Sequence, residues 1–75
     1  MPMFAKKLTQ AGHTRRFVVT EAGGVTGWEV RVEQDSQVVH QMCYTDWHRV
    51  ERAMKSLSQQ IDELEREGWQ ATQPV

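Results

Sequence analysis

Residues 45–69 read TDWHRVERAMKSLSQQIDELEREGW. Apolar residues recur here at spacings of three and four, which places them on one stripe of an α-helix: Trp47, Val50, Met54, Leu57, Ile61 and Leu64. Thr45 supplies a hydroxyl suited to an N-cap, and Gly68 stands where helices usually end in a left-handed residue, so that Trp69 can contact Leu64. We predict one long amphipathic helix from about Asp46 to Glu67.

Two strands are predicted before this helix. Residues 28–33 alternate apolar and charged side chains, which is typical of a strand with one buried face, and residues 15–21 are rich in β-branched and aromatic types. Residues 22–27 contain three glycines and form the connecting loop. If the apolar residues of both strands share one face, the numbers of paired residues add to an odd value. That face would hold Phe17, Val19, Trp28, Val30 and Val32.

A third strand is predicted from Val38 to Tyr44, after a turn at residues 34–37. Two orientations are open, because a slip of one residue exchanges the two faces of a strand. Either Val39, Gln41 and Cys43 point inward, or Val38, His40, Met42 and Tyr44 do. We favour the second set because it buries more apolar area.

The expected fold class is therefore α+β, a three-stranded antiparallel β-meander followed by one long amphipathic C-terminal helix (βββα). The domain spans residues 15–69. Residues 1–14 lack a clear period and are expected to form an N-terminal arm or a short element, and residues 70–75 a frayed tail. The expected core comprises Phe17, Val19, Trp28, Val30, Val32, Trp47, Val50, Met54 and Leu57.

Composition limits the classes of function. The chain has 75 residues, enough for one domain, and its nine basic and ten acidic residues give a net charge of −1. Cys43 is the single cysteine, so no disulfide framework is present, and no apolar run approaches the roughly 20 residues that span a bilayer. We expect a cytoplasmic protein that does not bind membranes.

Three side chains of the kind that bind soft metals lie close in the sequence: His40, Cys43 and His48. Zinc sites usually take about four ligands, often from paired cysteines, and the parity of His40 and Cys43 places them on opposite faces of a strand. Cys43 with His48 also lacks the oxyanion-binding loop and orienting third residue that a nucleophile needs. We expect no enzymatic activity, no metal site and no cofactor.

Charge is unevenly distributed along the chain, because four basic residues precede the first acidic residue, Glu21. With Arg31 they would form a basic strip able to contact the phosphates of a single-stranded nucleic acid. The negative charges of Glu29 and Glu33 weaken the attraction of this strip for phosphate. Nucleic-acid binding is therefore the alternative function and not the favoured one. The residues concerned are Lys6, Lys7, Arg15, Arg16 and Arg31.

The length of the helix suggests a different function. About 22 helical residues span about 33 Å, whereas strands of about seven residues span about 23 Å. The end of the helix would then extend beyond the sheet and leave Ile61 and Leu64 to be covered by Trp69 and a second copy. We expect a small non-enzymatic interaction or assembly module, homodimeric through Ile61, Leu64 and Trp69.

The quartet Gly27-Trp28-Glu29-Val30, the strand 38–44 and the helix start Thr45-Asp46-Trp47 carry a resemblance. Over residues 15–67 the chain resembles small uncharacterised bacterial domains in which a helix follows a sheet. In topology alone it is similar to whirly and coactivator-type single-strand-binding proteins. The first resemblance implies the βββα fold and no activity, and the second would imply single-strand binding by analogy of fold.

Overall fold

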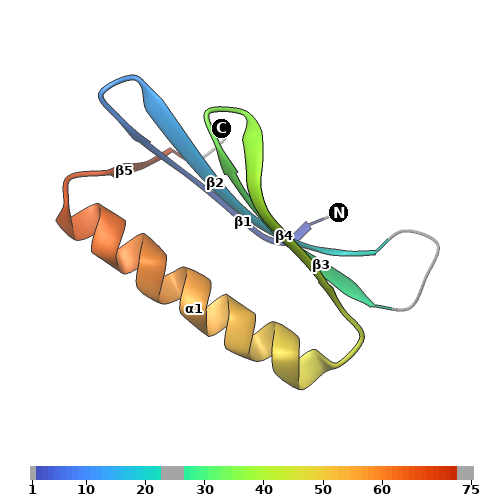
Figure 1. Cartoon of the computed structure of the whole chain (residues 1–75). Helices are drawn as coiled ribbons and strands as arrows, with labels where there is room; N and C mark the ends of the chain where they lie inside the picture. Colours follow the sequence, from blue (N-terminus) through green and yellow to red (C-terminus); the bar gives the residue numbers. More distant parts are fainter. Residues whose placement is uncertain (1, 23–26, 73–75) are drawn as a thin grey trace.

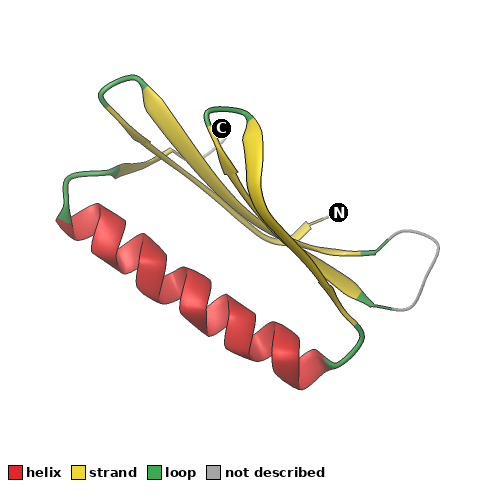
Figure 2. Ribbon diagram, in the orientation of Figure 1, coloured by secondary structure: helices red, strands yellow, loops and turns green. Residues whose placement is uncertain are grey.

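The computed structural model describes residues 2–22 and 27–72, which form five strands and one helix. The strands pair antiparallel in the order β4-β3-β2-β1-β5, and α1 lies on one face of the sheet, while no element among the described residues covers the other face (Figures 1 and 2). The α+β class is confirmed, but the sheet has five strands where three were predicted. The elements are β1 (Pro2–Gln10), β2 (His13–Glu21), β3 (Trp28–Gln34), β4 (Gln37–Tyr44), α1 (Trp47–Arg66) and β5 (Gln70–Thr72).

The segment expected to be an arm is instead a full strand. β1 pairs with β2 along its length, with Leu8 opposite Arg15, and Leu8 is wholly buried. Its apolar alternation is interrupted by Lys6, which lies on the inner face and whose ammonium forms an ion pair with Glu65 of α1 at 2.9 Å. A long cationic side chain can cover an apolar surface and keep its charge in water. Because a lysine stands at an inward-facing position, the alternation of apolar and polar residues that indicates a strand is not visible in the sequence of β1.

The predicted frayed tail is also partly ordered, because β5 pairs with residues Lys7–Thr9 of β1. This short strand lies where the chain returns from the end of α1 to the sheet, beside β1 (Figure 1). Residues 73–75 lie outside the described residues.

The predicted strand register is confirmed. Phe17 pairs with Val32 and Val19 with Val30, so the paired numbers add to an odd value. In β4, His40, Met42 and Tyr44 lie opposite Val32, Val30 and Trp28, as in the favoured orientation. Val38 is the exception, because a bulge shifts it opposite Glu33 on the outer face. This orientation was favoured because it would bury more apolar area. That reason was wrong, because β4 is exposed along its length apart from a half-buried Tyr44.

Two hairpin turns have the backbone geometry of the primed two-residue type. Ala11 and Gly12 join β1 to β2 with φ of 51° and 82°, and Asp35 and Ser36 join β3 to β4 with φ of 51° and 70°. The second confirms the turn predicted at residues 34–37. Of the predicted glycine loop, residues 23–26 lie outside the described residues.

Both helix ends follow capping chemistry. At the N-terminus the cap is Asp46 rather than the predicted Thr45, and its carboxylate accepts a hydrogen bond from the His48 amide at 2.9 Å. At the C-terminus Gly68 has φ of 105°, and the Trp69 amide donates to the Leu64 carbonyl at 3.0 Å. The Gly68 amide donates to Glu65 at 3.1 Å, which completes the predicted Schellman motif.

Replacing Gly68 with alanine should lower the free energy of unfolding by about 1 kcal/mol, because a Cβ is costly at positive φ. The new Cβ would also lie 2.9 Å from Nε2 of Gln10, which donates to the Glu67 carbonyl. Gly12→Ala is the control for the conformational cost alone, because Gly12 also has positive φ but an added Cβ there meets nothing within 4 Å, so Gly68→Ala should cost at least as much as Gly12→Ala. Denaturant unfolding measures both variants. A Gly68→Ala midpoint equal to or above wild type would contradict the motif's contribution.

The core lies between α1 and strands β1, β2 and β3. Ile61 and Leu64 belong to it, together with Leu8 from the segment that was expected to be an arm. Trp47 was expected in the core, but it is 39% exposed and packs against Trp28 with ring centroids 5.2 Å apart. The buried cluster is Leu8, Phe17, Val19, Val30, Val50, Leu57, Ile61 and Leu64.

Candidate functional site

The five basic residues predicted to bind nucleic acid do not share a surface. Lys6 and Arg15 lie on the face that α1 covers, where Lys6 binds Glu65 at 2.9 Å and the Arg15 guanidinium lies 5.3 Å from the ring centre of Trp69. By strand parity, Lys7, Arg16 and Arg31 lie on the outer face. The set is therefore divided between the two faces of the sheet.

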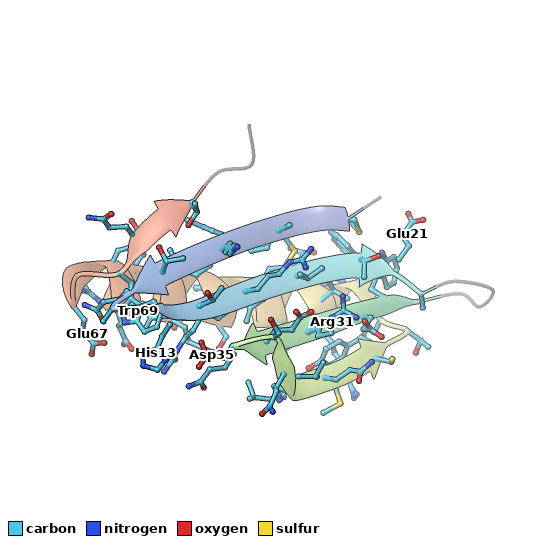
Figure 3. The ribbon with its side chains drawn as sticks, turned by 90° about the horizontal axis from the view of Figure 1, so that it is seen from above. His13, Glu21, Arg31, Asp35, Glu67 and Trp69 are labelled. Atoms are coloured by element: carbon cyan, nitrogen blue, oxygen red, sulfur yellow. The ribbon has the colours of Figure 1, made fainter. Side chains whose placement is uncertain are left out.

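Arg31 lies on the outer face (Figure 3), and its guanidinium contacts two carboxylates. Its Nε lies 2.9 Å from Glu33 and its terminal nitrogen 3.5 Å from Glu29. Glu29 also accepts a hydrogen bond from the Gln41 amide at 2.7 Å. A guanidinium flanked in this way adds little attraction for phosphate, so Lys7 and Arg16 are what remains of the strip on this face.

A hollow of about 550 Å³ lies on the outer face beside those two residues. Its lining mixes both charges, with Lys7 and Arg16 against Glu33 and Asp35. This mixture gives the hollow no strong preference for an anion or a cation.

Asp35 has a structural role at this end of the sheet, where it lies beside His13 (Figure 3). Its carboxylate accepts a hydrogen bond from the Thr14 amide at 2.9 Å and lies 3.1 Å from the His13 ring nitrogen. These contacts, the Thr14 amide first, hold the pKa of Asp35 below its ordinary value. They join the β3–β4 turn to the start of β2.

The three residues considered as metal ligands point in different directions. His40 lies opposite Val32 on the inner face, Cys43 lies opposite Glu29 on the outer face, and His48 begins α1 in an exposed position. Over residues 2–22 and 27–72, no group of three or more His, Cys, Asp or Glu side chains is placed to hold a metal ion. The arrangement separates Cys43 from His40, as the strand parity predicts.

The predicted dimer interface is covered by the chain itself. Ile61 and Leu64 are 3% and 7% exposed, and Trp69 is half-buried beside Arg15. The argument for an overhanging helix was wrong, because β1 and β2 have nine residues each and span about 30 Å, the length of the 20-residue helix. A lysine at position 61 or 64 would enter the core rather than an interface.

A different apolar surface was missed by sequence reasoning. β4 is an edge strand, and Val38, Val39 and Met42 on it are 52%, 58% and 46% exposed. The sequence contains a signal for this surface: residues 37–44 are uncharged and contain apolar side chains of both parities, and the last strand of a meander is an edge. Figure 3 shows β4 along one side of the sheet and β5 along the other.

A groove separates β4 from the helix on the inner face. It has a volume of about 780 Å³, and residues from β2, β3, β4 and α1 line it. Val32 and Leu57 contribute apolar walls, and Arg49 and Arg52 lie where the groove passes along the first half of α1.

Within the described ranges, no helix combines the length and the hydropathy that crossing a lipid bilayer requires. Comparison of the chain with protein-family models, with curated protein sequences and with solved structures gives no match in any of the three.

Proposed function

We propose that the protein is an assembly module that forms a homodimer by pairing β4 of one chain with β4 of a second copy. The observation that carries this proposal is the composition of the edge: residues 37–44 contain neither a charged residue nor a proline. Proteins that stay monomeric usually protect a long edge strand with such residues, or cover it. Here Val38, Val39 and Met42 are exposed along the edge instead.

The opposite side of the sheet is less suited to pairing. β5 contains three residues, and it covers β1 at Lys7–Thr9. β4 has eight residues, and beyond its bulge the segment from His40 to Tyr44 pairs regularly with β3. A regular segment of this length offers a second copy a row of backbone hydrogen-bonding groups.

Symmetry fixes the form of such a dimer. Two identical edge strands that pair antiparallel are related by a two-fold axis perpendicular to the sheet, so the contact is isologous and closed. The product is one continuous sheet with twice the five strands of a single chain and with both helices on the same face. The uncharged residues of β4 create no repulsion between like charges across this junction.

The apolar area available to a partner along this edge is that of Val38, Val39 and Met42, which are 52%, 58% and 46% exposed. We rank a protein partner above nucleic acid because the basic residues are divided between two faces and Arg31 is paired.

Met42→Lys should dissociate the dimer, because a lysine on an edge strand opposes pairing with a second strand. Light scattering during size exclusion at micromolar concentration should give twice 8.7 kDa for the wild type and a single chain for the variant. Met3→Lys is the matched control, since Met3 is 44% exposed but lies on β1, away from β4. It should remain dimeric.

A wild-type protein that is monomeric at high micromolar concentration would refute the proposal. If Met3→Lys dissociates the dimer and Met42→Lys does not, the interface lies on the other side of the sheet and the β4 pairing is wrong. Met42 is 46% exposed, so the Met42→Lys chain should keep its circular dichroism spectrum, which separates loss of pairing from loss of fold.

A further inference from the structure

The inner face of the sheet is wider than the helix that covers it. Four strands of seven to nine residues, spaced about 4.8 Å apart, with their side chains form a face close to 20 Å wide. One helix with its side chains covers about 10 Å. The buried cluster joins α1 to β1, β2 and β3; of β4, Tyr44 packs against this cluster and residues 37–43 are exposed. The uncovered half has room for one further helix, and the groove of about 780 Å³ lies there.

The walls of the groove suit a helix. Val30 and Val32 of β3 lie at its sheet side, and Leu57 lies on α1. The side of α1 that faces the groove carries Ala53 and Ser56, one turn apart. Small residues on a helix allow a second helix to approach closely, at the 8–10 Å separation of packed helices.

The charge of the groove is uniform. Arg15, Arg49 and Arg52 line it, with His40 on the β4 side, and no aspartate or glutamate from the described residues does. This is a local excess of positive charge in a chain whose net charge is −1. Complementary potentials across an interface favour the correct partner and raise its association rate. The occupant should therefore be acidic.

We infer that the groove binds an acidic amphipathic helix of another protein, laid beside α1 on the inner face of β3 and β4. Apolar anchors at positions i, i+3, i+4 and i+7 would face Val32 and Leu57, and carboxylates on the flank would face Arg49 and Arg52. The inference does not require the β4 dimer, because the groove belongs to one chain. Edge pairing between two copies leaves the inner face open.

A designed peptide tests the groove without knowledge of the natural partner. The probe is a fluorescent peptide of about 18 residues, about 27 Å long as a helix, with leucines at the anchor positions and glutamates and alanines elsewhere. The control peptide has lysine at each glutamate position. Fluorescence anisotropy at low salt should show the acidic peptide binding at least about tenfold more tightly than the basic one. The difference should shrink as salt is raised.

Variants on α1 locate the site. Arg49→Glu with Arg52→Glu should weaken binding of the acidic peptide by about tenfold or more, because two attractive contacts become repulsive. Lys55→Glu with Arg66→Glu is the matched control: it reverses the same number of charges in α1 at residues outside the groove lining, and should change affinity less than about twofold. Ser56→Phe should block the groove sterically at an exposed position without disturbing the core.

The outcomes separate this inference from the dimer. Amide chemical shifts that move at Ala53, Ser56 and His40 on addition of the acidic peptide would support the groove, also in the monomeric Met42→Lys chain. Equal affinity for the two peptides, or no loss in the double arginine variant, would overturn it. Loss of the wild-type dimer in the double arginine variant would also overturn it, because a second copy would then occupy the groove.

Discussion

Leu8→Ala should lower the free energy of unfolding by about 2–5 kcal/mol, the usual cost of truncating a fully buried leucine. Leu8 is 0% exposed and packs in the cluster between the sheet and α1. A chain of 75 residues has a total stability on the order of 4–11 kcal/mol, so this single change removes a large part of it. Urea unfolding followed by circular dichroism gives the value.

Met3→Ala in the same strand is the control, because Met3 is 44% exposed and should cost no more than about 0.5 kcal/mol. Equal effects of the two substitutions would show that β1 does not belong to the folded core. A Leu8→Ala effect below about 1 kcal/mol would lead to the same conclusion, and would favour the N-terminal arm expected from the sequence.

Gly27→Ala should be at least as disruptive as many core truncations, with a loss of about 2 kcal/mol or more. Gly27 has φ of 147°, and a Cβ there would lie 2.7 Å from the carbonyl oxygen of Tyr44. Because that oxygen belongs to the backbone, it cannot rotate away, and the clash must separate the start of β3 from the end of β4. Thermal unfolding should show a clear drop in midpoint.

Gly12→Ala again separates the cost of positive φ from the cost of the steric clash, since it also places a Cβ at positive φ but in open space. Gly12→Ala should therefore lose only the conformational part, about 1 kcal/mol. If Gly27→Ala costs no more than Gly12→Ala, the approach of Tyr44 to Gly27 is not close in solution. Gly27→Ala should also weaken the proposed β4 dimer, because the clash displaces the end of β4, the strand that pairs with the second copy.

The central part of the fold could be predicted from the sequence because local patterns and burial agree there. The stripe of α1 and the alternation of β3 each report one buried face, and the odd register of Phe17 with Val32 follows from them. β1 could not be predicted in this way, because Lys6 occupies an inner-face position and its charge is satisfied by Glu65, 59 residues away. A local pattern contains no information about a partner so distant.

The candidate surfaces were harder to predict for a related reason. The prediction that the helix extends beyond the sheet depended on strands of about seven residues. β1 was not predicted and β2 was predicted too short, so the predicted sheet was too small for the helix. Once β1 is present, Ile61 and Leu64 are covered and the uncovered apolar residues are those of β4. The interpretation of Val38, Val39 and Met42 as core residues or edge residues depends on which faces α1 reaches, and this is a property of the whole sheet.

The pairing of β1 with β5 affects how the protein is made. Leu8 lies opposite Ala71, which the ribosome adds 63 residues later. At about 5–20 residues per second, β1 waits about 3–13 s for that neighbour, whereas β2 follows almost at once. During synthesis the nascent sheet therefore has two open sides, β1 and the most recent strand. Until Gln70–Thr72 are made, the backbone of Lys7–Thr9 lacks the neighbour that it has on this side in the finished sheet.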